Sequence, residues 1–256
     1  MKVNRKHITE TFDTYTSNYN LEDSKIRLKY DHTYRVADFC EQIARVQGLC
    51  EADIDLAWVL GMFHDIGRFE QVRRYGTFQD KDSVNHAALS ADLLFCDGYA
   101  KLFLNAGEEE MKLMDTAVRF HNIYILPEKL TERELLFCNI LRDADKIDIL
   151  RVNCETPREE IYNLSTEVFE NSDMTDEVYE GLMNLQPVNR KYSRPGIDYI
   201  MGDIGFVFDL AFDESKSIIK KQGYLDELMD CQSKNTETQM RIETVRDTVR
   251  KYLKKY

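Results

Sequence analysis

Histidine and aspartate side chains occur inside apolar segments of this 256-residue chain, where their polar groups need partners. The segment WVLGMFHDIGRFEQ, residues 58–71, shows this most clearly, because a nearly unbroken apolar run ends in His64 and Asp65. An unpaired charge in apolar surroundings is costly, so both side chains must be hydrogen-bonded or neutralised in the folded protein. Groups from elsewhere in the chain must supply those partners.

Three further histidines share a face with apolar residues when their segments are given helical spacing. His32 aligns with apolar residues 4, 7, 11 and 14 positions later in the chain. His86 aligns with Leu89 and Leu93, and His121 ends another apolar stripe. Because residues three, four and seven positions apart lie on one face of an α-helix, all three imidazoles are predicted to face inward.

Two aspartates lie inside a further apolar segment, LLFCNILRDADKIDIL, residues 135–150. Asp143 and Asp145 each share a helical face with apolar side chains of this segment, so both could face the interior. The periodicity alone does not choose between them.

The convergence of these histidines and acids favours a bound divalent metal. A single inward histidine is more often a hydrogen-bonded core residue than a ligand. Several imidazoles and carboxylates together are explained more simply by a cation, which offsets carboxylate charge and takes up imidazole lone pairs. Nitrogen and oxygen donors without thiolate favour Fe, Mn, Co, Ni or Zn. Six donors suit two ions about 3.5–4 Å apart, with Asp65 as the bridging carboxylate.

The elements that must position these residues are predicted to be helices, in an all-α fold of about ten helices. The low content of Pro (4) and Gly (11) agrees with that fold class. Thr131 and Glu134 form a capping box, and Gly67 is expected to end the helix that His64 and Asp65 close. Residues 67–85 are predicted to be a polar loop. Helical patterns cover residues 24–46, 53–66, 86–95, 108–120, 131–150, 205–221 and 236–255.

Composition and charge restrict the class of partner and the compartment. The net charge of −12 and the pI near 5.0 argue against the nucleic-acid backbone as the main partner and are compatible with cation binding. Six cysteines without a CxxC pair are predicted to be reduced thiols. The first 20 residues lack the apolar region of a signal peptide, and no apolar run reaches the roughly 18 residues of a membrane span. We therefore expect a cytoplasmic protein with no membrane partner.

The order of the six donors, H…HD…H…H…D, resembles the six-ligand form of the HD superfamily of metal-dependent phosphohydrolases. The segments HDIGRFEQVRRYGTFQDKDSVNHA and LRDADKIDIL are similar to a bacterial branch usually called HD-domain proteins. The family's last ligand is the Asp of an AD(K/R) motif, which implies Asp145 and leaves Asp143 as a residue that orients a ligating histidine. Under this resemblance the metal ligands are His32, His64, Asp65, His86, His121 and Asp145.

The resemblance also implies the fold and the domain organisation. It covers about residues 25–150 and implies an all-α helical bundle of the HD-domain/PDEase-like type with additional C-terminal helices. We expect a single all-α domain over residues 1–256, with the metal-binding core at 25–150 and a C-terminal helical extension at 151–256.

The activity implied by the resemblance is hydrolysis of a phosphate ester, in a nucleotide or a related phosphorylated metabolite, with two divalent transition-metal ions as cofactors. Asp65, as the bridge, and Arg68, as a phosphate fork, are the predicted catalytic residues. Arg68 and Lys146 are the predicted substrate-binding residues. Residues 66–81 carry four basic and two acidic side chains, which is a local excess of positive charge suited to an anionic substrate.

Two alternatives use the same donors. Some helical proteins that resemble the HD group, such as inositol oxygenase and a phosphonate-cleaving oxygenase, hold a mixed-valent di-iron centre on this ligand set. A non-catalytic protein that binds metal or nucleotide is the other alternative. The basic segment 66–81 favours the hydrolase.

Overall fold

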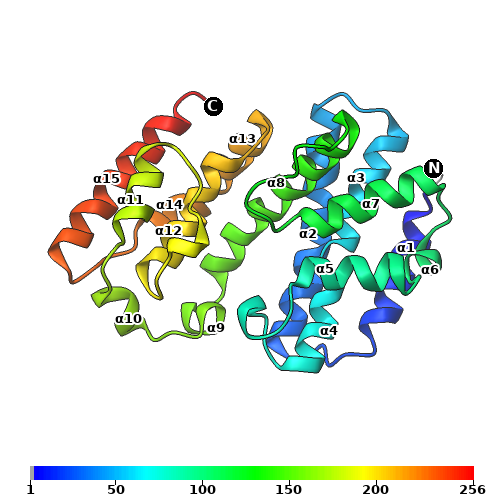
Figure 1. Cartoon of the computed structure of the whole chain (residues 1–256), viewed down its shortest axis with the longest axis horizontal. Helices are drawn as coiled ribbons and strands as arrows, with labels where there is room; N and C mark the ends of the chain where they lie inside the picture. Colours follow the sequence, from blue (N-terminus) through cyan, green and yellow to red (C-terminus); the bar gives the residue numbers. More distant parts are fainter. Residues whose placement is uncertain (1–2) are drawn as a thin grey trace. The chain divides into compact units, whose positions relative to one another are not determined.

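The computed structural model describes residues 3–256, and no β-strand occurs among them (Figure 1). The prediction of an all-α fold with additional C-terminal helices is therefore confirmed. The chain folds as two compact units, one up to Asp145 and one from Lys146 onward. The single domain over residues 1–256, with its core at 25–150 and its extension at 151–256, stays a prediction.

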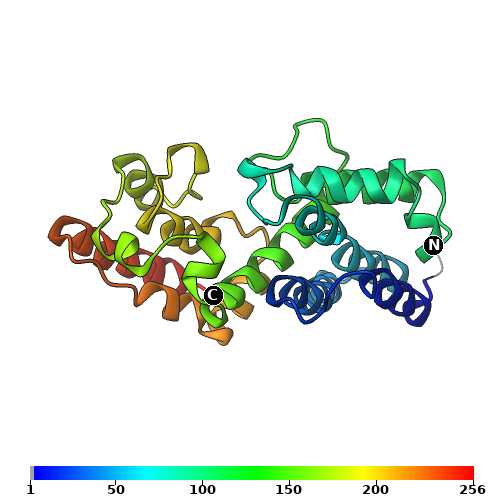
Figure 2. The same cartoon turned by 90° about the horizontal axis from the view of Figure 1, so that it is seen from below.

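The first unit consists of seven α-helices and the first part of an eighth, together with a 3₁₀ turn (η1) and a π-helical segment (η2) among its described residues. In chain order these elements are α1 (Arg5–Thr16), α2 (Ser24–Val46), α3 (Glu51–Phe63), α4 (Ile66–Tyr75), η1 (Asp80–Asp82), α5 (His86–Ala91), η2 (Asp92–Cys96), α6 (Ala100–Phe103), α7 (Glu108–Phe120) and α8 (Glu132–Glu155). In Figure 2 the blue helices α1 and α2 lie on one side of this unit, and the blue-green helix α5 lies on the other.

Helix α3 is the central helix of the first unit. Every residue of α3 from Leu56 to Phe63 is buried, since this helix is apolar on all sides. Helix α2 packs along it, and the two backbones meet closely at Gly61, where a Cβ atom would lie 2.4 Å from the Cα of Ala37. Glycine is required at this crossing because any side chain would separate the helices. The crossing places His32 of α2 and His64 at the end of α3 close together.

The predicted polar loop over residues 67–85 is wrong for its first half, because Ile66–Tyr75 forms helix α4. Phe69 is fully buried, and the buried carboxylate of Glu70 accepts hydrogen bonds from Arg73 and Arg74. These contacts stabilise a helix whose sequence is too polar to show an apolar stripe. The helix ends at Gly76, which has a left-handed backbone with φ of 69°.

Gly67 does not end a helix, contrary to the sequence prediction. Helix α3 ends at Phe63, and Gly67 lies in the first turn of α4. Its amide donates to Oγ of Ser90, and a Cβ atom there would lie 2.6 Å from the amide nitrogen of Ser90. The glycine therefore permits close packing of α4 against α5, the helix that begins with His86.

Other boundaries agree with the sequence to different degrees. The predicted helices over 24–46 and 108–120 are confirmed as α2 and α7. The Thr131 capping box is confirmed, since Thr131 and Glu134 exchange backbone and side-chain hydrogen bonds of 2.8 and 3.2 Å. The helix expected over 205–221 is broken into a 3₁₀ segment, η4 (Gly205–Asp209), and helix α13 (Asp213–Gln222).

The second unit contains the end of α8 and seven further α-helices among its described residues. They are α9 (Arg158–Tyr162), α10 (Thr166–Asn171), α11 (Asp176–Met183), α12 (Ile197–Ile204), α13, α14 (Tyr224–Met229) and α15 (Thr236–Leu253), with η3 (Arg190–Tyr192) and η4 between them. Helix α15 packs on α11 through its apolar stripe, which includes the buried residues Ile242, Val245 and Val249. Within residues 3–256, no helix combines the length and the apolar character needed to cross a membrane.

Candidate metal centre

The six predicted donor residues lie in, or at the ends of, six helices of the first unit. Most of them stand where a helix begins or ends, so their positions depend on helix packing more than on any single helix. They are His32 in α2, His64 after α3, Asp65 before α4, His86 at the start of α5, His121 after α7, and Asp145 in α8. The four imidazoles are at most 7% exposed.

The histidines form two pairs on either side of Asp65. Nε2 of His32 lies 3.2 Å from Nε2 of His64, and Nε2 of His86 lies 3.1 Å from Nε2 of His121. Oδ2 of Asp65 lies 3.7 and 3.5 Å from the first pair, and Oδ1 lies 3.6 and 3.8 Å from the second pair. Each pair with Asp65 therefore forms a compact three-residue group, and the carboxylate is shared.

Asp145 adds a second carboxylate beside the pair formed by His32 and His64. Its Oδ1 lies 3.1 Å from Nε2 of His32 and 3.7 Å from Nε2 of His64. All six residues singled out by the sequence are thus brought together, although their roles as ligands stay a prediction. Asp143 is buried, at 1% exposure.

Hydrogen bonds fix the imidazole tautomers of three histidines. Nδ1 of His64 lies 2.7 Å from the carbonyl oxygen of Gly61, and Nδ1 of His121 lies 2.7 Å from that of Val118. A carbonyl oxygen only accepts, so Nδ1 donates in both rings and Nε2 carries the lone pair when the ring is neutral. Nδ1 of His86 likewise donates, at 2.6 Å, to the carboxylate Oδ2 of Asp80. The Nε2 lone pairs of these rings therefore point toward Asp65.

The ionisation of the site favours cation binding. Burial lowers the pKa of His121 to about 3, and burial and the nearby Arg68 charge lower the pKa of His86. These two rings are therefore neutral at pH 7. Burial alone would raise the pKa of Asp65, but the charges of Lys29 and Arg68 and the interaction with His64 hold that pKa well below its usual range, so the carboxylate is ionised.

The donor set fits divalent ions. In the second pair the lone pairs of His86 and His121 face each other at 3.1 Å, and a cation between them would relieve their repulsion. Within the part of the chain that the structure describes, Oδ1 of Asp65 is buried without a hydrogen-bond partner. A buried carboxylate oxygen without a donor is costly, and metal coordination is one way to satisfy it.

Lys29 and Arg68 place two cations beside Asp65. Nζ of Lys29, one helical turn before His32, lies 2.6 Å from Oδ2 of Asp65. Nε of Arg68 lies 3.7 Å from Oδ1 of Asp65 and, among the described residues, has no hydrogen-bond partner. The Lys29 ammonium and the Arg68 guanidinium also lie 5.9 and 5.7 Å from the ring centre of Phe78. Sequence reasoning missed Lys29, although its spacing of three from His32 places it on the same helical face.

Asp80 and Gln71 are two further residues that sequence reasoning missed. Asp80 accepts a hydrogen bond from Nδ1 of His86 through Oδ2 and one of 3.0 Å from Nη1 of Arg68 through Oδ1. The fully buried Gln71 accepts from Nη1 of Arg68 and donates to Oδ1 of Asp80 and to the carbonyl of Val84. Burial would raise the pKa of Asp80, but its hydrogen bond and charge interaction with His86 and the Arg68 charge lower it, so it is ionised.

Lys146, the other predicted substrate-binding residue, pairs with an acid. Its Nζ lies 2.7 Å from Oδ2 of Asp209, and its side chain is 10% exposed. Its role toward a substrate stays a prediction.

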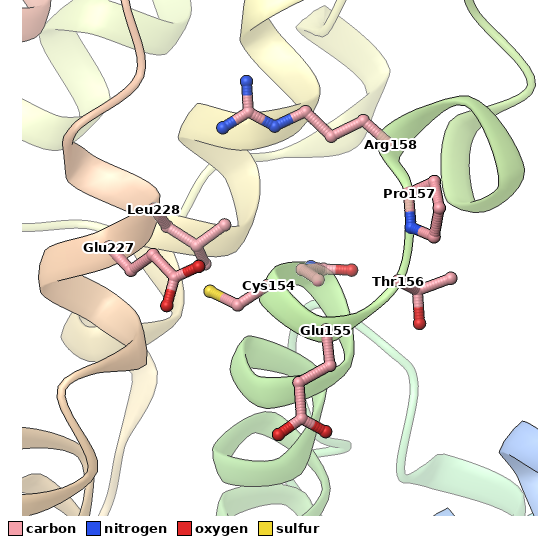
Figure 3. A pocket seen from close by; sticks show the side chains of 8 residues that line it. Cys154, Glu155, Thr156, Pro157, Arg158, Glu227 and Leu228 are labelled. Atoms are coloured by element: carbon pink, nitrogen blue, oxygen red, sulfur yellow. The ribbon is translucent and has the colours of Figure 1, made fainter.

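A separate hollow of about 350 Å³ lies in the second unit (Figure 3). Its lining includes Cys154 and Arg158 on one side and Glu227 and Leu228 on another. None of the predicted site residues lines it.

Comparison with known proteins identifies the segment that carries the six donors. Residues 30–150 match the family model described as HD domain, and this range contains all six. The comparisons with curated proteins and with solved structures returned no match.

Proposed function

We propose that this chain, whose residues 30–150 match the family model described as HD domain, is a phosphohydrolase that depends on two divalent transition-metal ions. The observation that carries the proposal is the position of Asp65. Each of its two oxygens lies beside a different histidine pair, and the oxygen beside His86 and His121 has no hydrogen-bond partner among the described residues. This arrangement supports a carboxylate that bridges two ions.

The residues divide into two groups of ligands around that bridge. His32, His64 and Asp145 would hold one ion, His86 and His121 would hold the other, and Asp65 would contact both. Bound divalent ions supply a water molecule of lowered pKa and offset the negative charge of a phosphoryl group. The hydrogen bonds from Nδ1 to the Gly61 and Val118 carbonyls keep the imidazole lone pairs directed inward.

Arg68 would bind the phosphoryl group. Its Nη1 is held by Gln71, Phe78 and Asp80, so this end of the guanidinium is fixed. Its Nε is buried, unpartnered within residues 3–256 and close to Asp65. A fixed guanidinium with an unpaired N–H beside the centre suits a phosphate oxygen, since charge-assisted hydrogen bonds to phosphate are strong.

We further propose that the substrate is a phosphate ester of a nucleotide or a related metabolite, with Lys146 as a second contact. A positioned cation such as Arg68 supports a substrate that carries a phosphoryl anion, and hydrolysis is the activity that the family resemblance implies for such a substrate.

The test is metal analysis of the purified full-length chain, followed by turnover assays. The chain is loaded with Mn, Fe, Co or Ni and offered a panel of nucleotides and sugar phosphates, with and without oxygen. We expect about two ions per chain and release of phosphate or alcohol that requires metal and is independent of oxygen. Substrate-dependent oxygen uptake with reduced iron would contradict the proposal in favour of an oxygenase. Tight nucleotide binding without turnover under every metal would contradict it in favour of a binding protein.

A further inference from the structure

Asp80 contacts both a predicted metal ligand and the predicted phosphate-binding residue. Its Oδ2 lies 2.6 Å from Nδ1 of His86, and its Oδ1 lies 3.0 Å from Nη1 of Arg68. Each carboxylate oxygen therefore serves a different partner. Asp80 stands at the start of a 3₁₀ turn, and its side chain is 31% exposed, less than that of a freely solvated surface acid.

We propose that Asp80 is a positioning residue that orients His86 and Arg68 as one unit, so that metal binding and phosphate binding are coupled. The proposal rests on the proposed function in its assignment of His86 and Arg68. With Nδ1 donating to Asp80, His86 presents the Nε2 lone pair to the centre. With Nη1 held by the same carboxylate, the Arg68 guanidinium keeps its Nε toward Asp65.

The surroundings of Asp80 keep its two contacts in place. Gln71 donates to Oδ1 of Asp80 at 3.0 Å, to Oγ of Ser83 at 2.9 Å and to the carbonyl of Val84 at 3.0 Å. The same glutamine accepts from Nη1 of Arg68 at 2.7 Å. The segment from Asp80 to Val84 is thus tied to helix α4, which carries Arg68, and leads directly into α5, which begins with His86.

Replacing Asp80 by asparagine tests whether the carboxylate orients His86 and Arg68 or only fills space between them. Asn has nearly the same shape but only one accepting oxygen, so it can accept from His86 or from Arg68 but not from both, and one of the two loses its contact with residue 80. Asp82 offers a matched control, because it lies in the same turn, is exposed, and its carboxylate has no partner in the described structure.

The first measurement is Co²⁺ binding to the full-length chain, followed by visible absorption. We expect Asp80→Asn to weaken the more weakly bound ion by roughly 10–100-fold, as is typical when the partner of a ligating histidine is removed. The absorption bands of that ion should also change, whereas Asp82→Asn should match the wild type. Unchanged Co²⁺ affinity and spectrum in a folded Asp80→Asn variant would overturn the proposal. Because it needs no substrate, this measurement decides the role of Asp80 toward the ligand even if phosphohydrolase activity is not found.

The second measurement is calorimetric titration of the Co²⁺-loaded chain with inorganic phosphate. We expect Arg68→Ala and Asp80→Asn each to lower the phosphate affinity by roughly tenfold, and the double variant to be little weaker than either alone. Asp80→Glu, which keeps two accepting oxygens, should recover part of the loss. Effects that simply multiply in the double variant would show that Asp80 does not act through Arg68 and would overturn the coupling.

Discussion

The two units of the molecule each bury an aspartate, and they treat its charge in opposite ways. In the first unit, Asp65 is 2% exposed and lies against the ammonium of Lys29, with Arg68 on its other side. In the second unit, Asp203 is 5% exposed and accepts hydrogen bonds from neutral groups, Nδ2 of Asn153 at 2.8 Å and the hydroxyl of Tyr162. The pKa of Asp65 is held well below its usual range, whereas burial raises the pKa of Asp203 to about 6.

The difference between the partners of Asp65 and those of Asp203 indicates a different role for each carboxylate. The charge of Arg190 and the neutral donors of Asp203 offset only part of the cost of its burial, so the pKa of Asp203 stays above its ordinary value. Cations keep Asp65 charged, and one of its oxygens remains without a donor among the described residues. A carboxylate that is both ionised and incompletely satisfied is suited to a metal, while Asp203 is suited to tying α8, α9 and α12 together.

The largest expected effect comes from removing the charged aspartate. Asp65→Ala should remove at least one ion per chain and lower turnover by roughly 10²–10³-fold or more, because both histidine pairs lose their shared carboxylate. Metal content by mass spectrometry and the rate of phosphate release measure the two effects. Asp203→Asn is the matched control and should retain both metals and activity. A folded Asp65→Ala variant with full metal content and turnover would refute the bridging role.

The next effect concerns the cation that keeps Asp65 charged. In metal-free protein, Lys29→Met should lower the free energy of unfolding by about 3 kcal/mol, because a buried carboxylate loses its ammonium partner. Added divalent metal should recover part of that loss, since it offsets the same charge. Denaturant unfolding with chelator and with Mn²⁺ measures both values. Lys25→Met, an exposed change in the same helix, should shift stability by less than about 0.5 kcal/mol. Equal losses with and without metal would contradict this account.

Of these two buried aspartates, the sequence indicated Asp65 but not Asp203. Asp65 was found because it follows a long apolar run and because four histidines share inward helical faces with the same interior. Helices α2 and α7 were bounded correctly for the same reason, since their apolar residues repeat at helical spacing. Asp203 lies outside the predicted helical patterns, and nothing in its spacing indicated burial.

Residues that act through contacts outside their own helix were harder to predict. Helix α4 was missed because its buried residues include the polar Glu70 and Gln71, whose partners include Tyr19 and Ser83 from other parts of the chain. Asp80 lies in an aperiodic segment, so no helical face relates it to His86. Lys29 was detectable from its spacing to His32, but a lysine on an otherwise apolar face is ordinarily read as solvent-exposed.

The free energy of unfolding should depend on pH through Asp203 of the second unit. The pKa of Asp203 is about 6 in the folded state, above the ordinary value of 3.8 that applies on unfolding. The folded state therefore binds this proton more tightly, and stability is lost as pH rises through the interval between these values. Asp203→Asn removes the titration, so its stability relative to wild type should increase by about 2 kcal/mol between pH 4.5 and pH 7.5.

Denaturant unfolding of the full-length wild type and the Asp203→Asn variant at each pH gives this difference directly. Taking the difference cancels every other group that titrates equally in both proteins. A difference that is constant over this range, or that shrinks as pH rises, would show that Asp203 is ionised in the folded state like Asp65.

The smallest expected effect tests the neutral donors of Asp203. Tyr162→Phe removes one of its hydrogen bonds and should lower the free energy of unfolding by about 1 kcal/mol near pH 7.5. The loss should be smaller at pH 4.5, because a hydroxyl donates more strongly to a carboxylate than to a carboxylic acid. Tyr199→Phe is the control, since Tyr199 contacts the Tyr162 ring but its hydroxyl makes no hydrogen bond within the described residues. In the Asp203→Asn background the Tyr162→Phe loss should no longer depend on pH. A loss that keeps its pH dependence there would place its origin in another group.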